Sequence, residues 1–228
     1  MSIYWIIFIA IGILSWIVQA RLQSKFKKYS QIGTANGMTG SEVAEKMLHD
    51  SGIYDVQITC TPGHLTDHYN PTNKTVNLSE SVYASNSIAA AAVAAHECGH
   101  ALQHAKAYAP LTVRSKLVPV VSFSSKWVMW ILLGGMFLLH IFPQLMLAGI
   151  VLFAMTTLFS FVTLPVEIDA SRRALNWLEE SNITSRETYP QAKDALKSAA
   201  YTYVIAAVGS LATLLYYILI FLGGGRRS

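Results

Sequence analysis

Long apolar segments constrain this chain more than any other feature of its sequence. They cover residues 3–20, 127–141, 145–164 and 201–222, and a helix of about 20 such residues crosses the hydrocarbon core of a bilayer. The second segment reaches that length only if it begins near residue 118. Charged residues make up only 13% of the chain, whereas about 25% is usual in soluble proteins. Because lipid offers no partners to an open backbone, these segments predict about four transmembrane helices.

Basic residues directly follow the first apolar segment, at Arg21, Lys25, Lys27 and Lys28. A cleavable signal peptide carries its basic residues in front of the apolar stretch, so this segment is predicted to remain as a membrane span. Loops rich in lysine and arginine stay on the cytoplasmic side of a membrane. The sequence therefore predicts an external N-terminus and a cytoplasmic location for the residues after the first span.

The positive charge of the chain indicates contact with lipid and not with nucleic acid. The formal net charge is +4 and the pI is near 9.0, but the basic residues lie beside apolar segments, where they meet anionic lipid head groups. The only two cysteines are Cys60 and Cys98, which is typical of a reducing, cytoplasmic setting. We expect the lipid bilayer as a partner, no nucleic acid and no structural disulfide.

The region after the first span has the mixed polarity of an ordinary folded domain. Thr39, followed three residues later by Glu42, predicts a capping box that opens a short amphipathic helix, and Gly52 is placed to end it. A long Ala-rich helix is predicted over residues 88–107. The segments predicted to form a small sheet are residues 56–60, 65–69 and 74–78.

Prolines divide the second half of the chain in the predicted structure. A polar connection is expected around residues 110–119, which begin and end with proline. Pro165 is expected to begin a polar, helix-prone stretch that ends at residue 180. Pro190 is well placed as the first residue of a separate helix that ends near residue 197.

The predicted Ala-rich helix carries the pattern H-E-x-x-H, at His96, Glu97, Cys98, Gly99 and His100. On a helix with about 3.6 residues per turn, both imidazoles lie on one face and can point a nitrogen at one zinc ion about 2 Å away. Glu97 is rotated by roughly 100° from His96, beside the ion without binding it, so it can serve as a general base. The pattern also arises by chance, but the small residues around it permit close approach of another element.

Other side chains of metal-binding type have simpler explanations. Cys98 falls on the far side of the helix from the two histidines and is predicted to be a packing residue. His104 lies one further turn along, too far to share an ion with His96. His64 and His68 are four residues apart, but the turn residues around them exclude a helix, in which that spacing would be meaningful.

A catalytic zinc site needs a third protein ligand and an open position for water. Glu167 is the predicted ligand, because it stands where the third apolar segment ends on the predicted cytoplasmic side. Asp169 is the alternative ligand, or a residue that hydrogen-bonds a ligand histidine. A solvated carboxylate near a helix start is the simpler explanation of Glu167.

The predicted strand at residues 65–69 precedes the H-E-x-x-H helix. A strand near such a site can bind an extended peptide by adding it to the sheet edge. An ordinary structural strand is the alternative. The candidates for substrate contact are Leu65, Thr66, Asp67, His68 and Tyr69.

Four motifs occur in order along the chain: residues 63–71 (GHLTDHYNP), 78–80 (LSE), 94–101 (AAHECGHA) and 167–174 (EIDASRRA). Together they resemble the YugP-type family of bacterial membrane zinc metallopeptidases, and the resemblance runs from the first span to the last. It implies a gluzincin-like site with His96 and His100 as ligands, Glu97 as base and Glu167 as third ligand. It also implies a multi-pass protein of the bacterial plasma membrane, and the basic residues after the first span predict that the site faces the cytoplasm.

The chain departs from family patterns at three positions. The more distant HtpX-like proteases have an Asp four residues after the third-ligand Glu, where this chain has Ser171. Family members commonly have Asp in place of Asn70 and a bulkier apolar residue in place of Cys98. None of these changes affects a predicted ligand.

The predicted fold is an integral membrane α+β protein, in which a zincin-like domain with a small sheet is joined to about four transmembrane helices. The predicted parts are a first transmembrane helix (1–20), a cytoplasmic zincin-like catalytic region (21–117), a transmembrane hairpin (118–165), a helical segment with the third zinc ligand (166–200) and a fourth transmembrane helix (201–222).

The predicted function is hydrolysis of peptide bonds in membrane or membrane-adjacent proteins, by a zinc-activated water with Glu97 as base. A catalytically silent membrane scaffold is the alternative, but a scaffold has no need of Glu97. A transporter is disfavoured because the apolar segments carry few ionisable residues, with His140 as the main exception.

Overall fold

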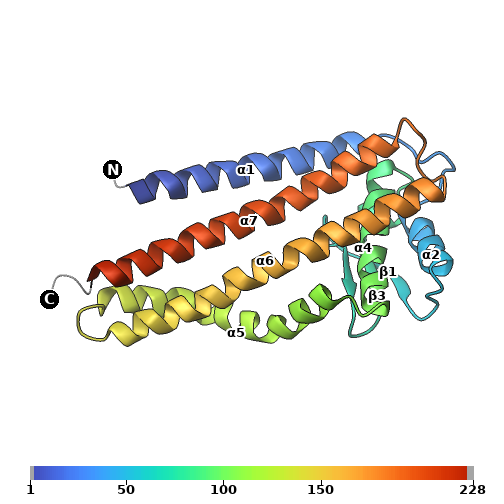
Figure 1. Cartoon of the computed structure of the whole chain (residues 1–228). Coiled ribbons are helices and arrows are strands. Elements are labelled where there is room, and N and C mark those ends of the chain that lie inside the picture. The colour runs from blue at the N-terminus through green and yellow to red at the C-terminus, as the bar shows by residue number, and fades with distance from the viewer. Residues whose placement is uncertain (1–2, 225–228) are drawn as a thin grey trace. The chain divides into compact units, whose positions relative to one another are not determined.

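The computed structural model describes residues 3–224, and most of them are helical (Figure 1). Among the described residues, four helices are long and apolar enough to cross a membrane: α1 (Ile3–Tyr29), α5 (Ala109–Phe137), α6 (Pro143–Glu180) and α7 (Tyr189–Gly224). This number agrees with the number of spans predicted from the apolar segments.

The chain forms two compact units. The helical unit consists of the chain up to Ile17, residues Thr112–Leu164 and the chain from Thr202 onward. The sheet unit consists of Val18–Leu111 and Pro165–Tyr201. Helices α1, α5, α6 and α7 each have residues in both units.

In the helical unit, α5 and α6 pack closely around a small apolar core. Leu132 on α5 and Met146 on α6 are almost completely buried. A Cβ atom at Gly135 would lie only 2.6 Å from the Cα atom of Met146, so this glycine permits the close approach of the two backbones. Large apolar side chains such as Trp130, which is 71% exposed, cover the outside. Such a surface is suited to lipid.

The prolines do not interrupt the helices as the sequence predicted. The expected connection around residues 110–119 is helical, because Pro110 occupies the first turn of α5, where its missing N–H costs no helical bond. Pro119 and Pro165 lie inside α5 and α6, which continue through them. The predicted helix at residues 190–197 is likewise the first part of the single helix α7.

The sheet unit contains a three-stranded sheet with the order β1-β3-β2. Strand β1 (Gln57–Thr61) runs parallel to β3 (Thr75–Ser79), and β2 (His68–Asn70) runs antiparallel to it. The central strand β3 has its alternate residues Val76 and Leu78 completely buried. Strand β2 therefore forms one edge of the sheet.

Strand β2 begins three residues later than the predicted strand at residues 65–69. Leu65 has a backbone φ of +59°, a left-handed conformation that cannot continue a strand. The carboxylate of Asp67 accepts hydrogen bonds from the backbone N–H (2.7 Å) and the hydroxyl (3.1 Å) of Ser79. These local contacts hold the first part of the segment as a loop.

Helix α2 (Gly40–Asp50) begins with the predicted capping box. The Thr39 hydroxyl accepts from the Glu42 N–H at 3.4 Å, and the Glu42 carboxylate accepts from the Thr39 N–H at 2.8 Å. Its apolar face, including the fully buried Val43 and Met47, belongs to the main core of the sheet unit.

Helix α4 (Ile88–Ala105) belongs to that core and contacts α2, the short helix α3 (Glu80–Tyr83) and the sheet. The Ser87 hydroxyl caps its first turn by accepting from the Ala90 N–H at 3.2 Å. Its alanines are nearly all buried, since small side chains allow neighbours to pack on several faces of one helix. The H-E-x-x-H residues are thus held on a rigid, buried element.

Candidate metal centre

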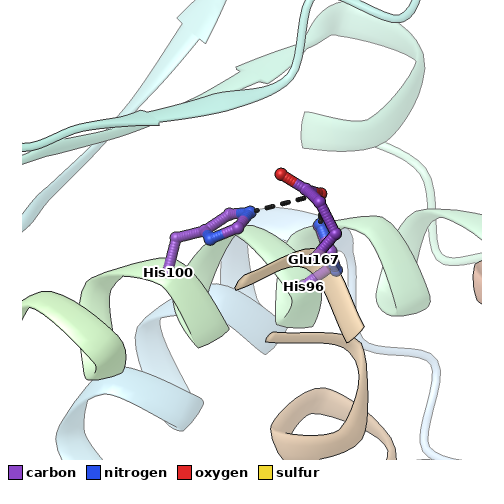
Figure 2. Close-up of side chains that lie close together, drawn as sticks. All are labelled: His96, His100 and Glu167. Carbon is purple, nitrogen blue, oxygen red and sulfur yellow. Dashed lines mark ion pairs between the residues drawn. The ribbon is translucent and has the colours of Figure 1, made fainter. Parts of the chain in front are cut away.

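Three side chains of metal-binding type converge in the sheet unit. His96 and His100 project from successive turns of α4, and Glu167 projects from α6 toward both imidazole rings (Figure 2). One ligand atom from each of the three residues lies within 4.8 Å of the other two. The structure thus brings together the three residues predicted to be ligands.

Two ligand-atom distances in this group are close to those around a zinc ion. The Glu167 Oε2 atom lies 3.3 Å from His96 Nε2 and 3.7 Å from His100 Nε2. Two ligand atoms that each bind a tetrahedral zinc ion at 2.0–2.1 Å are about 3.3 to 3.4 Å apart. The donor set of two imidazoles and one carboxylate leaves one tetrahedral position for water. These residues therefore fit zinc in both chemistry and spacing.

The electrostatics of the group favour a cation. Glu167 is only 3% exposed, and a buried carboxylate is costly unless a positive charge or hydrogen bonds compensate it. Burial alone would lower the pKa of His100, yet the hydrogen bond with Glu167 and the negative charges of Glu97 and Glu167 raise it. The surroundings thus attract positive charge to the point between the three side chains.

Glycine at position 99 allows close backbone contact between α4 and α6, the two helices that carry the predicted ligands. A Cβ atom at Gly99 would lie 2.6 Å from the carbonyl oxygen of Ala170 and 3.1 Å from its Cα atom. Both atoms belong to the backbone of α6 and cannot rotate away. Ala170 is three residues from Glu167 on that helix, so this contact sets the distance of Glu167 from the histidines.

Glu97 points toward the sheet. Its Oε2 atom accepts a hydrogen bond of 2.9 Å from the backbone N–H of Tyr69 on β2. It is 8% exposed and does not belong to the group of three ligand-type residues. The carboxylate therefore lies next to an edge strand and outside the group of predicted ligands, at the position that helical geometry predicts for it.

The ring nitrogens of the histidines that face away from Glu167 also have partners. His96 Nδ1 lies 3.1 Å from the hydroxyl of Ser171, and His100 Nδ1 lies 3.0 Å from Oε1 of Gln103. Contacts of this kind fix the orientation and basicity of metal-binding imidazoles. Ser171 thus contacts a ligand histidine from the position at which the HtpX-like pattern has an Asp.

Asp169 lies outside the group of three. Its two carboxylate oxygens accept hydrogen bonds from Arg172 and Arg173, each at 2.6 Å, and from the Gln103 amide at 3.0 Å. Within the part of the chain that the structure describes, the predicted hydrogen bond from Asp169 to His96 or His100 is not found. Gln103 lies between Asp169 and His100 and contacts both.

The remaining histidines and Cys98 have other contacts. Cys98 is completely buried, and burial raises the pKa of its thiol, which opposes formation of a metal-binding thiolate. His104 Nδ1 lies 2.9 Å from the Tyr69 hydroxyl, and His68 Nδ1 lies 2.8 Å from the carbonyl oxygen of Thr66. The His64 ring packs edge-on against Phe26.

The chain matches, over residues 4–222, the family model described as "Putative neutral zinc metallopeptidase". It belongs to this family. It is also 42% identical over 215 residues to "Putative membrane protease YugP" of Bacillus subtilis (strain 168), a match that covers 94% of each chain. No solved structure matches the chain. Zinc is the metal of this family, and His96, His100 and Glu167 form the group that fits it.

Of the residues predicted to contact substrate, only His68 and Tyr69 lie in β2. Leu65, Thr66 and Asp67 lie in the preceding loop. Because the Tyr69 N–H points at Glu97, this part of β2 borders the catalytic motif.

Gln103 and the Tyr69 backbone were missed by sequence reasoning. Gln103 follows His100 by three residues, which places it on nearly the same face of the helix, and a polar residue at that position of an Ala-rich helix was an available signal. No local signal connects the Tyr69 N–H with Glu97, because the contact depends on how the sheet packs on α4.

Removal of the third side chain of this group tests its role. We expect Glu167→Ala to lose most of its zinc, because two imidazoles supply only half of a tetrahedral shell. We expect Asp169→Ala to weaken zinc binding by about 10- to 100-fold, since Asp169 acts through Gln103. The measurement is the zinc content and zinc affinity of the purified proteins. Full occupancy in Glu167→Ala with an empty site in Asp169→Ala would mean that Asp169 is the ligand.

Proposed function

We propose that the chain is a membrane-embedded zinc metalloendopeptidase that hydrolyses peptide bonds of membrane or membrane-adjacent proteins. The observation that carries this proposal is the convergence of His96, His100 and Glu167 beside a fourth residue, Glu97, that faces a sheet edge. Membership of a zinc metallopeptidase family supports the same reaction class.

In the proposed site, His96, His100 and Glu167 hold zinc. Bound zinc polarises a scissile carbonyl and lowers the pKa of a water molecule toward about 7. The proposed catalytic region combines residues 21–117 with the helical segment 166–200 and has a zincin-like arrangement. Support for that arrangement comes from the passage of α4 beneath a small sheet with an edge strand.

Glu97 is the proposed general base. Its carboxylate takes a proton from the attacking water and delivers it to the leaving nitrogen of the cleaved bond. The hydrogen bond from the Tyr69 N–H holds one carboxylate oxygen toward β2, and the other oxygen is left to exchange the proton. The same contact places the base next to the strand on which a substrate would lie.

Strand β2 is the proposed place for an extended substrate segment. It is an edge strand, and an extended peptide can bind such a strand by adding to the edge of the sheet. Its residues His68 and Tyr69 are the substrate-contacting candidates. The four apolar helices would keep this strand close to membrane proteins, which favours them as substrates.

A catalytically silent scaffold is the alternative function. The position of Glu97 opposes it. A charged side chain that is 8% exposed and outside the ligand group contributes little to a scaffold, because burying a charge is unfavourable without a specific role.

Substitution of the base separates hydrolysis from zinc binding. We expect Glu97→Gln to keep its zinc and to lose casein hydrolysis by at least about 100-fold, because the amide preserves shape but cannot accept the proton. Glu45→Gln, a matched change on the exposed face of α2, should leave hydrolysis unchanged. The measurement is turnover by the purified, zinc-loaded full chain. Undiminished turnover by Glu97→Gln would contradict the proposed mechanism.

We further propose that the site faces the cytoplasm of a bacterial cell. The support is the run of basic residues after the first span, of which Lys25, Lys27 and Lys28 lie in the last turns of α1. With four crossings, the loop between α5 and α6 would then lie outside the cell.

Cysteine labelling of intact cells tests this orientation. In a Cys60→Ser background, which removes the exposed native thiol, an impermeant reagent should label His140→Cys in the loop between α5 and α6. It should not label Gln31→Cys until the cells are opened. Labelling of Gln31→Cys in intact cells, with His140→Cys protected, would reverse the topology.

A further inference from the structure

Gln103 is a completely buried amide on α4 with three polar contacts in the sheet unit. Its Oε1 atom lies 3.0 Å from His100 Nδ1. Its Nε2 atom donates to the carbonyl oxygen of Val166 at 2.8 Å and to Asp169 Oδ2 at 3.0 Å. The side chain therefore connects the H-E-x-x-H helix with the segment of α6 that carries Glu167.

The contacts allow only one orientation of this amide. Val166 offers a carbonyl oxygen, and Asp169 is a carboxylate that two arginines hold in its charged form. Both groups only accept hydrogen bonds, so the NH₂ group of Gln103 must face them. A flipped amide would place its oxygen against two other oxygens. Oε1 must therefore face His100.

The orientation of the amide in turn selects the tautomer of His100. Because Oε1 is an acceptor, a neutral His100 ring carries its hydrogen on Nδ1 and leaves the lone pair on Nε2. Nε2 is the atom that lies 3.7 Å from Glu167 Oε2, so it faces the point at which a metal would bind. Gln103 thus keeps His100 Nε2, the predicted ligand atom, unprotonated in the neutral ring.

The Gln103 side chain also contacts the segment of α6 that carries Glu167, the third predicted ligand. Val166 and Asp169, its two acceptors, flank Glu167 on α6. One uncharged side chain is therefore bonded to the segments that carry two of the three ligand-type residues, and these segments are distant in the sequence.

The polar groups of α6 that Gln103 contacts do not need its hydrogen bonds. Asp169 keeps Arg172 and Arg173 as partners in any case, and Val166 is an interior residue of a continuous helix. An apolar residue of similar volume would fill the same space without the cost of burying an amide. The contact with His100 is what such a residue would lack.

We propose that Gln103 is a positioning residue of the metal centre, which fixes the His100 tautomer and ties it to the Glu167 segment. This inference rests on the proposed zinc site at His96, His100 and Glu167. It concerns metal binding alone and does not depend on peptide hydrolysis.

The test compares Gln103→Met with the wild-type full chain in detergent. Methionine has a similar length but can neither accept from His100 nor donate to α6. We expect zinc affinity, measured by competition with a chromophoric chelator, to fall by about 10- to 100-fold. We also expect the visible spectrum of the cobalt-substituted protein to change, because the ligand geometry is altered. Thermal unfolding of the zinc-free proteins should differ little.

Thr184→Val is the matched control. It removes another buried side-chain hydrogen bond of the sheet unit, from the Thr184 hydroxyl to the carbonyl oxygen of Leu178. We expect it to keep wild-type zinc affinity and the wild-type cobalt spectrum. An equal loss of zinc affinity in Thr184→Val would assign the effect to general stability and overturn the role of Gln103.

Wild-type zinc affinity and an unchanged cobalt spectrum in Gln103→Met would also overturn the proposed role of Gln103. A wild-type chain that binds no zinc would overturn the metal site and this inference together. A third outcome is that the wild-type chain binds zinc, Gln103→Met weakens that binding, and the wild-type chain hydrolyses no peptide. This outcome would support the inference and contradict only the proposed function.

Discussion

The contact between Gly99 and Ala170 is the constraint on which the candidate site depends. Two helices that are far apart in the sequence can place a carboxylate beside two imidazoles only if their backbones nearly touch. Any side chain at position 99 would meet the carbonyl oxygen of Ala170. The glycine of the H-E-x-x-H pattern therefore serves packing in this chain, while the two histidines of the pattern are the proposed zinc ligands.

Around that contact, the polar groups are arranged so that buried charge is compensated. Glu167 faces two imidazoles, and Glu97 accepts a hydrogen bond from the Tyr69 backbone. Asp169 forms ion pairs with two arginines. Gln103 joins two of these groups without adding a charge. Such a network is stable only when every member has a partner.

The parts of the structure that depend on local signals could be predicted from the sequence. The capping box at Thr39, the Ala-rich helix and the apolar spans are all encoded within a few turns of chain. The prediction that Glu167 lies near the histidines followed from topology and from the family resemblance. The contacts of Gln103 with α6 and of Glu97 with Tyr69 could not be predicted, because they depend on the tertiary packing of α6 and the sheet on α4. Residues 65–67 were predicted wrongly because side-chain bonding by Asp67 competes with strand formation.

X-ray absorption spectroscopy of the zinc-loaded full chain tests the central claim most directly, because it reports which atoms bind the metal. If His96, His100 and Glu167 are the ligands, the spectrum will show two imidazoles with oxygen donors, all at about 2.0 to 2.2 Å from zinc. A sulfur atom at about 2.3 Å would implicate Cys98 or Cys60, and a third imidazole would implicate another histidine. Either result would contradict the proposed metal centre.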